Sequence, residues 1–248
     1  MRKIKNKRIW IAGGMLVIVG ALALLFSSEK RWDWRESYQQ KSRDPYGTYV
    51  IAELLKAYYP GAPFTLLQDS LGALPDTYSQ SNYVFNGEGM ELESTETDKL
   101  LRFVEQGNCA FIASRTLPAL LTDRLFPSMY CKERYVAWSD YQSVVDSAVR
   151  FSLSHPTLGE PSPPVYRYPY RDEFRLYRWQ YIDTVFLCAG KSAGLEKLGT
   201  FEGAYPNFVR LSYGEGHFLL HTNPIAFSNV QLLDERTLLY AERGFSHL

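Results

Sequence analysis

The hydrophobic pattern divides the chain into one long apolar run and a series of short amphipathic segments. Residues 9–28 contain no charged side chain (IWIAGGMLVIVGALALLFSS). A helix needs about 20 apolar residues to cross a bilayer, so this run predicts a transmembrane helix. The leader, residues 1–8, carries five basic residues, whereas three follow the run at Lys30, Arg31 and Arg35. This bias predicts that the N-terminus lies in the cytoplasm.

A cleaved signal peptide is the alternative interpretation of the same run, and a buried core helix is a third. A signal peptide has a shorter apolar core and small side chains at its cleavage site, whereas bulky Phe26 precedes the two serines here. A retained anchor in the inner membrane is therefore favoured. We expect residues 29–43 to form a juxtamembrane stalk and residues 44–248 to form an α/β domain on the periplasmic side.

The first half of this domain alternates helix and strand signals. A helix is expected from Asp44-Pro45, with aspartate as N-cap and proline in the first turn, to Pro60-Gly61. Further elements are expected as follows: strands at 64–67 and 83–85, a turn at Asn86-Gly-Glu-Gly89, a helix beginning at Thr95-Glu-Thr-Asp98 and ending at Gly107, an apolar strand at Cys109–Ala113, and a helix at Leu117–Phe126. A strand, a helix and a buried strand in succession indicate a βαβ unit and a parallel sheet.

The spacing of apolar residues changes from a helical to a strand-like period between about residues 130 and 210. Apolar and polar residues alternate in Val149–Leu153, Tyr166–Tyr168 and Phe174–Ile182, which predicts antiparallel hairpins inserted into the α/β core. The core is expected to resume with strands at 185–188, 208–211 and, after the turn Gly214-Glu-Gly216, His217–His221. A last helix is expected to be capped by Ser228 or Asn229.

Composition narrows the function classes. The 27 basic and 27 acidic residues balance, so the chain lacks the basic surface that binding to nucleic acid requires. Three cysteines, Cys109, Cys131 and Cys188, are too few for a disulfide framework. The length of the domain predicts one folding unit with an insertion.

The residues that could act as metal ligands or nucleophiles are better explained by structural roles. His217 and His221 would share a metal ion on a helix, but on a strand they are about 13 Å apart. A nucleophile usually stands on a glycine-flanked turn after a strand, whereas Ser114 has no flanking glycine and Cys109 begins its strand. His155, in the predicted insertion, has no evident acidic partner in the sequence.

Two further segments are candidates for binding. Glu88 is a carboxylate near a predicted strand end, where α/β sheets bind ligands, although a plain turn is the favoured interpretation of its sequence. The stretch 166–181 is rich in tyrosine, tryptophan and arginine, a composition typical of glycan- and protein-binding surfaces. One face of an amphipathic sheet accounts for the same pattern.

Three segments resemble a known family: Asp44-Pro-Tyr-Gly-Thr48, Glu96–Ala113 and Gly214–Asn229 (GEGHFLLHTNPIAFSN). They are similar to domain-of-unknown-function family 4350, common in Bacteroidetes. The resemblance implies a flavodoxin-like sandwich related to class I glutamine amidotransferases, and membrane-complex partners such as MoxR-type ATPases and von Willebrand A-type proteins. It also implies a second membrane helix after the domain. The Gly-x-Cys-x-Gly elbow and His-x-Glu pair of the amidotransferases are missing from this sequence.

We therefore expect a membrane-anchored binding or scaffolding domain without catalytic, cofactor-binding or metal-ligating residues. Its expected partners are the lipid bilayer, through residues 9–28, and proteins of a membrane complex. Two alternatives remain: a degenerate hydrolase acting on cell-envelope material, and a glycan- or small-ligand-binding module.

Overall fold

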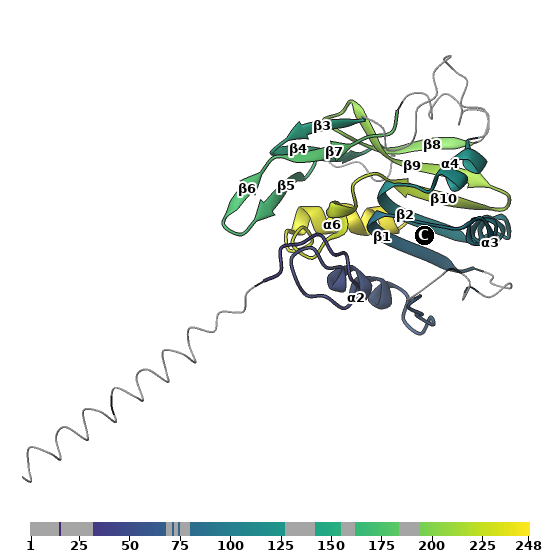
Figure 1. Cartoon of the computed structure of the whole chain (residues 1–248), viewed down its shortest axis with the longest axis horizontal. Coiled ribbons are helices and arrows are strands. Elements are labelled where there is room, and N and C mark those ends of the chain that lie inside the picture. The colour runs from purple at the N-terminus through teal and green to yellow at the C-terminus, as the bar shows by residue number, and fades with distance from the viewer. Residues whose placement is uncertain are drawn as a thin grey trace, which may run out of the picture. The chain divides into compact units, whose positions relative to one another are not determined.

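The computed structural model describes residues 15, 32–67, 71, 74, 80–126, 142–154, 162–183 and 194–248. The chain divides into two units, residues 1–33 and 34–248, and every element named below belongs to the second (Figure 1). Apart from Met15, the predicted anchor lies outside the described residues. None of the helices that the structure describes has both the length and the apolar character needed to cross a membrane.

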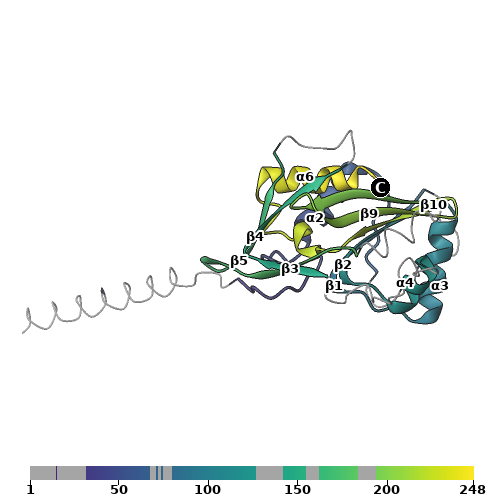
Figure 2. The same ribbon diagram turned by 90° about the horizontal axis from the view of Figure 1, so that it is seen from above.

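A curled mixed sheet dominates the unit (Figures 1 and 2). Its order is β1-β2-β10-β9-β8-β4-β5-β6. The first three strands in this order are parallel to one another: β1 (Asn82–Gly89), β2 (Cys109–Thr116) and β10 (Gly216–His221). The others pair antiparallel: β9 (Tyr205–Tyr213), β8 (Leu195–Phe201), β4 (Ala148–Leu153), β5 (Val165–Tyr170) and β6 (Glu173–Arg175). A separate pair joins β3 (Ser143–Asp146) to β7 (Tyr177–Gln180).

Helices cover both faces of the parallel part of the sheet. On one face lie α3 (Ser94–Glu105) and α4 (Ala119–Leu125), which pack on Ala110 and Ile112 of β2. On the other lie α2 (Tyr49–Tyr58), η2 (Pro224–Phe227) and α6 (Glu235–Phe245), which pack on Phe111 and Ala113 of the same strand. Because the first part of β2 is buried on both faces, the sequence of Cys109–Ala113 is apolar throughout instead of alternating.

The predicted βαβ unit is confirmed as β1-α3-β2. The strands β1 and β2 pair in parallel register, with Val84 opposite Phe111. The helix begins slightly earlier than expected because Glu93 and Glu96 form the capping box. The predicted helix after β2 is also confirmed, as α4.

Four local predictions are wrong. Residues 64–67 form no strand, and the side chains of Phe64 and Leu66 are exposed. Residues 86–89 are not a turn, because they continue β1 along β2. The first helix begins at Tyr49, after a turn in which the Gly47 amide donates to the Asp44 carbonyl. The last helix begins at Glu235, because the Asp234 side chain accepts from the amides of Arg236 and Thr237.

The sheet differs from the flavodoxin-like expectation beyond β10. The strands β4, β5, β6, β8 and β9 continue the core sheet with antiparallel pairing, whereas a flavodoxin-like sheet would be parallel across these positions. Residues 34–43 of the predicted stalk pack on the domain: Tyr38 is 7% exposed, and its carbonyl accepts from the Thr48 hydroxyl. The predicted strand at 185–188 lies outside the described residues.

Candidate functional site

The carboxyl ends of β1 and β2 meet at the edge where α/β sheets bind ligands. Arg115 of β2 lies at this edge, and its side chain is 19% exposed. Its Nη2 is 2.8 Å from Oε2 of Glu36 and its Nη1 is 3.4 Å from Oε1 of Glu88. Glu88 therefore lies near the end of β1 and not in the favoured turn. Its carboxylate pairs with an arginine that the sequence did not single out.

Tyrosines enclose the Arg115–Glu36 pair. The Tyr38 hydroxyl donates to Oε2 of Glu36 at 2.7 Å, and Arg115 both donates to the Tyr177 hydroxyl and lies 4.5 Å from the centre of that ring. Burial alone lowers the pKa of the guanidinium, but Tyr177 and Glu36 raise that pKa above its ordinary value. Burial raises the pKa of Tyr38 and Tyr177. The cluster is thus a charged arginine and carboxylate surrounded by neutral phenols.

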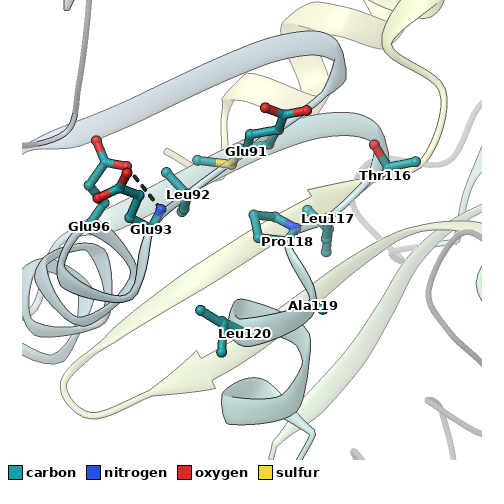
Figure 3. Close-up of a pocket in the computed structure, with 10 residues that line it drawn as sticks. Glu91, Leu92, Glu93, Glu96, Thr116, Leu117, Pro118, Ala119 and Leu120 are labelled. Atoms are coloured by element: carbon teal, nitrogen blue, oxygen red, sulfur yellow. Dashed lines mark hydrogen bonds between the residues drawn. The ribbon is translucent and has the colours of Figure 1, made fainter.

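A pocket of about 600 Å³ opens at the same edge, between the end of β1 and the start of α4 (Figure 3). Its floor and walls include Leu92, Leu117 and Leu120, and the carboxylate of Glu91 stands at its rim (Figure 3). Glu96 also lines the pocket, but its two oxygens accept from the main-chain amides of Glu93 and Leu71. The pocket therefore combines apolar walls with acidic side chains. Its lining residues are Met90, Glu91, Leu92, Glu93, Glu96, Thr116, Leu117, Pro118, Ala119 and Leu120.

The two possible nucleophiles are buried and engaged in the fold. The Ser114 hydroxyl is buried and donates to the Thr116 carbonyl at 2.7 Å. Cys109 is 4% exposed, and burial raises the pKa of its thiol to about 12. A protonated thiol is a weak nucleophile, so neither side chain has the environment of an activated one.

The two strand histidines point toward α6 and the C-terminal residues and do not share a ligand. Nε2 of His217 lies 3.1 Å from the His247 carbonyl oxygen. His221 is fully buried: its Nδ1 accepts from the Asn223 amide, and its Nε2 lies 3.1 Å from the Tyr240 hydroxyl. Burial lowers the pKa of His221 to about 3, so this imidazole is neutral. Within the part of the chain that the structure describes, no three His, Cys, Asp or Glu side chains gather as metal ligands.

The family-like motifs contact one another. The Asn229 side chain accepts from the Val50 amide at the start of α2 and donates to the carbonyls of Ser42 and Asp44. Gly47 is required in this turn, because a Cβ there would lie 2.2 Å from the Ser42 carbonyl oxygen. These motif residues therefore hold the start of α2 against the segment that follows η2.

The predicted aromatic stretch 166–181 forms β5, β6 and β7, with Tyr166 and Trp179 buried in the core. It reaches this edge through Tyr177, which contacts Arg115. The other predicted candidates, His155, Cys131 and Cys188, lie outside the described residues. Sequence reasoning missed Arg115, Glu36 and Tyr38, and the available signal for Arg115 was its position directly after an apolar strand.

Comparison with known proteins identifies a family for the chain but no activity. No curated protein matches it. Among solved structures, the exo-beta-1,4-mannosidase Op5Man5 from Opitutaceae bacterium strain TAV5 is similar, with a TM-score of 0.41 and 13% identity. The match covers 88% of this chain but 34% of the mannosidase, and similarity at this level carries no inference about fold or activity. Residues 40–243 match the model of a domain of unknown function (DUF4350), and the chain belongs to this family.

Proposed function

We propose that this chain is a membrane-anchored, non-catalytic domain that binds a partner protein at the carboxyl edge of its parallel strands. The anchor is the apolar run 9–28, and the binding site is the acidic pocket beside α3 and α4. The observation that carries the proposal is the lining of this pocket, which pairs leucines with carboxylates. A short partner segment with apolar and basic side chains has the matching chemistry.

The environment of the candidate nucleophiles supports a non-catalytic role. Ser114 is committed to a main-chain hydrogen bond, and the thiol of Cys109 has a raised pKa. The partly buried Arg115–Glu36 ion pair neutralises the positive charge that would attract an anionic substrate to this edge. Binding requires only the pocket, which stays open beside this cluster.

The family resemblance supplies the setting of the proposal. It favours an amidotransferase-like ancestry, an origin in Bacteroidetes and a membrane complex containing a MoxR-type ATPase and von Willebrand A-type proteins. In this complex the domain lies on the periplasmic side of the inner membrane, with the N-terminus in the cytoplasm. The tether then keeps the pocket close to partners in the same membrane.

Site-specific crosslinking in the native membrane tests this proposal. A photoreactive amino acid at Leu120, which is 47% exposed beside the pocket, is expected to capture a discrete membrane-complex protein. The same group at Leu233, 80% exposed and away from the pocket, is the matched control. Glu91→Lys should weaken capture at position 120 at least about tenfold if a basic segment binds. Glu196→Lys, which reverses the charge of an exposed residue on β8, should leave the capture at position 120 unchanged.

Equal capture at positions 120 and 233, or capture indifferent to Glu91→Lys, would contradict binding in the pocket. A separate measurement addresses catalysis. The folded chain should resist a fluorophosphonate and iodoacetamide at Ser114 and Cys109. Labelling of Ser114 that disappears in Ser114→Ala would instead favour the hydrolase alternative.

A further inference from the structure

The hairpin formed by β5 and β6 has an exposed apolar surface that the pocket does not use. Phe174 is 61% exposed and Leu176 is 70% exposed. Exposed and buried side chains alternate along this segment, because Tyr177 and Trp179 point into the core. Val145 of the neighbouring β3 is 57% exposed and is paired with Arg178. An apolar row of this kind on a monomer indicates an interaction surface.

Arginines surround this row. The segment 165–178 contains four arginines and two acidic residues, a net charge of +2 in a chain whose net charge is zero. The Arg167 guanidinium lies 5.2 Å from the Phe174 ring, and that of Arg175 lies 3.7 Å from the Tyr170 ring. Exposed phenylalanine and leucine mixed with arginine and tyrosine match the interface between water and an anionic lipid bilayer.

Trp34, the first residue of the second unit, contacts this hairpin. Trp34 packs on Tyr170, with ring centres 6.2 Å apart, and on Tyr46, whose hydroxyl donates to the Pro169 carbonyl. Pro169 is the cross-strand partner of Phe174. Six residue steps separate Ser28, the last residue of the apolar run, from Trp34, and they span at most about 20 Å even when fully extended.

We propose that the exposed side of the β5–β6 hairpin, with Leu176 directly after it, docks into the headgroup region of the membrane that holds the anchor. Phe174 and Leu176 enter the interface, and Arg167 and Arg171 contact anionic lipid phosphates. This inference rests on the proposed anchor, because the short connection is what keeps the hairpin near the bilayer. Docking gives the domain a second membrane contact, so that its orientation above the membrane is restricted.

A spin label measures the docking directly. The full chain is reconstituted into nanodiscs, with the label attached through a bioorthogonal amino acid at position 174 or, as the control, at position 233. In nanodiscs containing anionic lipid, the label at 174 should become more accessible to oxygen than to a nickel chelate, whereas the label at 233 should stay aqueous. Neutral lipid, or the Arg167→Glu/Arg171→Glu variant, should reduce the change at 174 severalfold.

The outcomes separate this proposal from the anchor on which it rests. If carbonate washing leaves the chain in the membrane while both labels stay aqueous, the hairpin does not dock and the inference is overturned. If carbonate removes the chain, the anchor itself is wrong. A label at 174 that is immobilised without gaining oxygen access indicates a protein or a second copy as the occupant, which also overturns lipid docking. The labelled positions are exposed, so folding is not at risk.

Discussion

His221 is a buried polar residue that specific partners hold in the core. Its ring is surrounded by Phe151, Phe208 and Phe227, where an imidazolium would be poorly solvated. The Asn223 amide donates to Nδ1, so the neutral ring carries its proton on Nε2, facing Tyr240. The histidine therefore acts as an uncharged hydrogen-bonding group of the core.

His221 predicts a dependence of stability on pH. Its pKa is about 3 in the folded chain and about 6.5 when unfolded. Between these values the unfolded chain binds a proton that the folded chain does not. The free energy of unfolding should therefore be highest above pH 6.5 and fall by up to about 1.4 kcal/mol per pH unit as the pH drops toward 3.

Urea denaturation between about pH 7 and pH 5 measures this slope, in a window above the titration of most carboxylates. His221→Gln should be less stable at neutral pH but show a flatter slope. His217→Gln, at a half-buried histidine, should retain most of the pH dependence of stability. A slope unchanged by His221→Gln would show that another group titrates.

At the scale of elements, contacts between distant segments decide where helices begin and end. The amide of Val50, in the first turn of α2, is capped by Asn229 and not by a side chain of its own segment. The Asn229 and Val230 amides in turn donate to the carbonyls of Gly47 and Pro45. Sequence rules for capping consider neighbouring residues, so they placed this helix start too early and assigned Asn229 to the wrong helix.

Asn229→Ala is predicted to destabilise the domain by about 2–4 kcal/mol, because it removes three hydrogen bonds from partly buried main-chain groups. The loss should appear as a lower midpoint of chemical denaturation and as faster hydrogen exchange at the Val50 amide. Asn82→Ala, at an exposed asparagine on β1, is the control. Equal effects of the two substitutions would rule out this role of Asn229 as the cap of α2.

At the scale of the molecule, residues 34–43 join the predicted anchor to the core through Glu36. Its carboxylate accepts from Tyr38 and pairs with Arg115 at the end of a central strand. The segment predicted to be a stalk is therefore an edge of the folded domain.

Arg115→Met is predicted to lower the free energy of unfolding by about 2–3 kcal/mol, less than the full cost of stranding a buried charge because the pair is partly exposed. Hydrogen exchange at the Tyr38 amide should also accelerate. The double variant Arg115→Met/Glu36→Gln should recover part of the loss, since it removes the unpaired carboxylate. Additive effects in the double-mutant cycle would mean that the two residues are not coupled.

The sequence by itself determined the features that depend on local periodicity. It predicted β1-α3-β2, the strand β10 and helix α4, because their apolar spacing is set within a few residues. It also separated the apolar run 9–28 from the domain, and it carried the motifs by which the chain was assigned to its family.

Only the tertiary structure decided how these pieces combine. Alternation in the second half of the chain indicates antiparallel strands but not their neighbours, so the extension of one sheet from β10 to β6 was not predictable. The clustering of Glu36, Arg115 and Tyr177, far apart in sequence, likewise depends on strand order. Ionic, capping and aromatic contacts between such distant residues are set by the packing of the whole chain, which residue spacing does not encode.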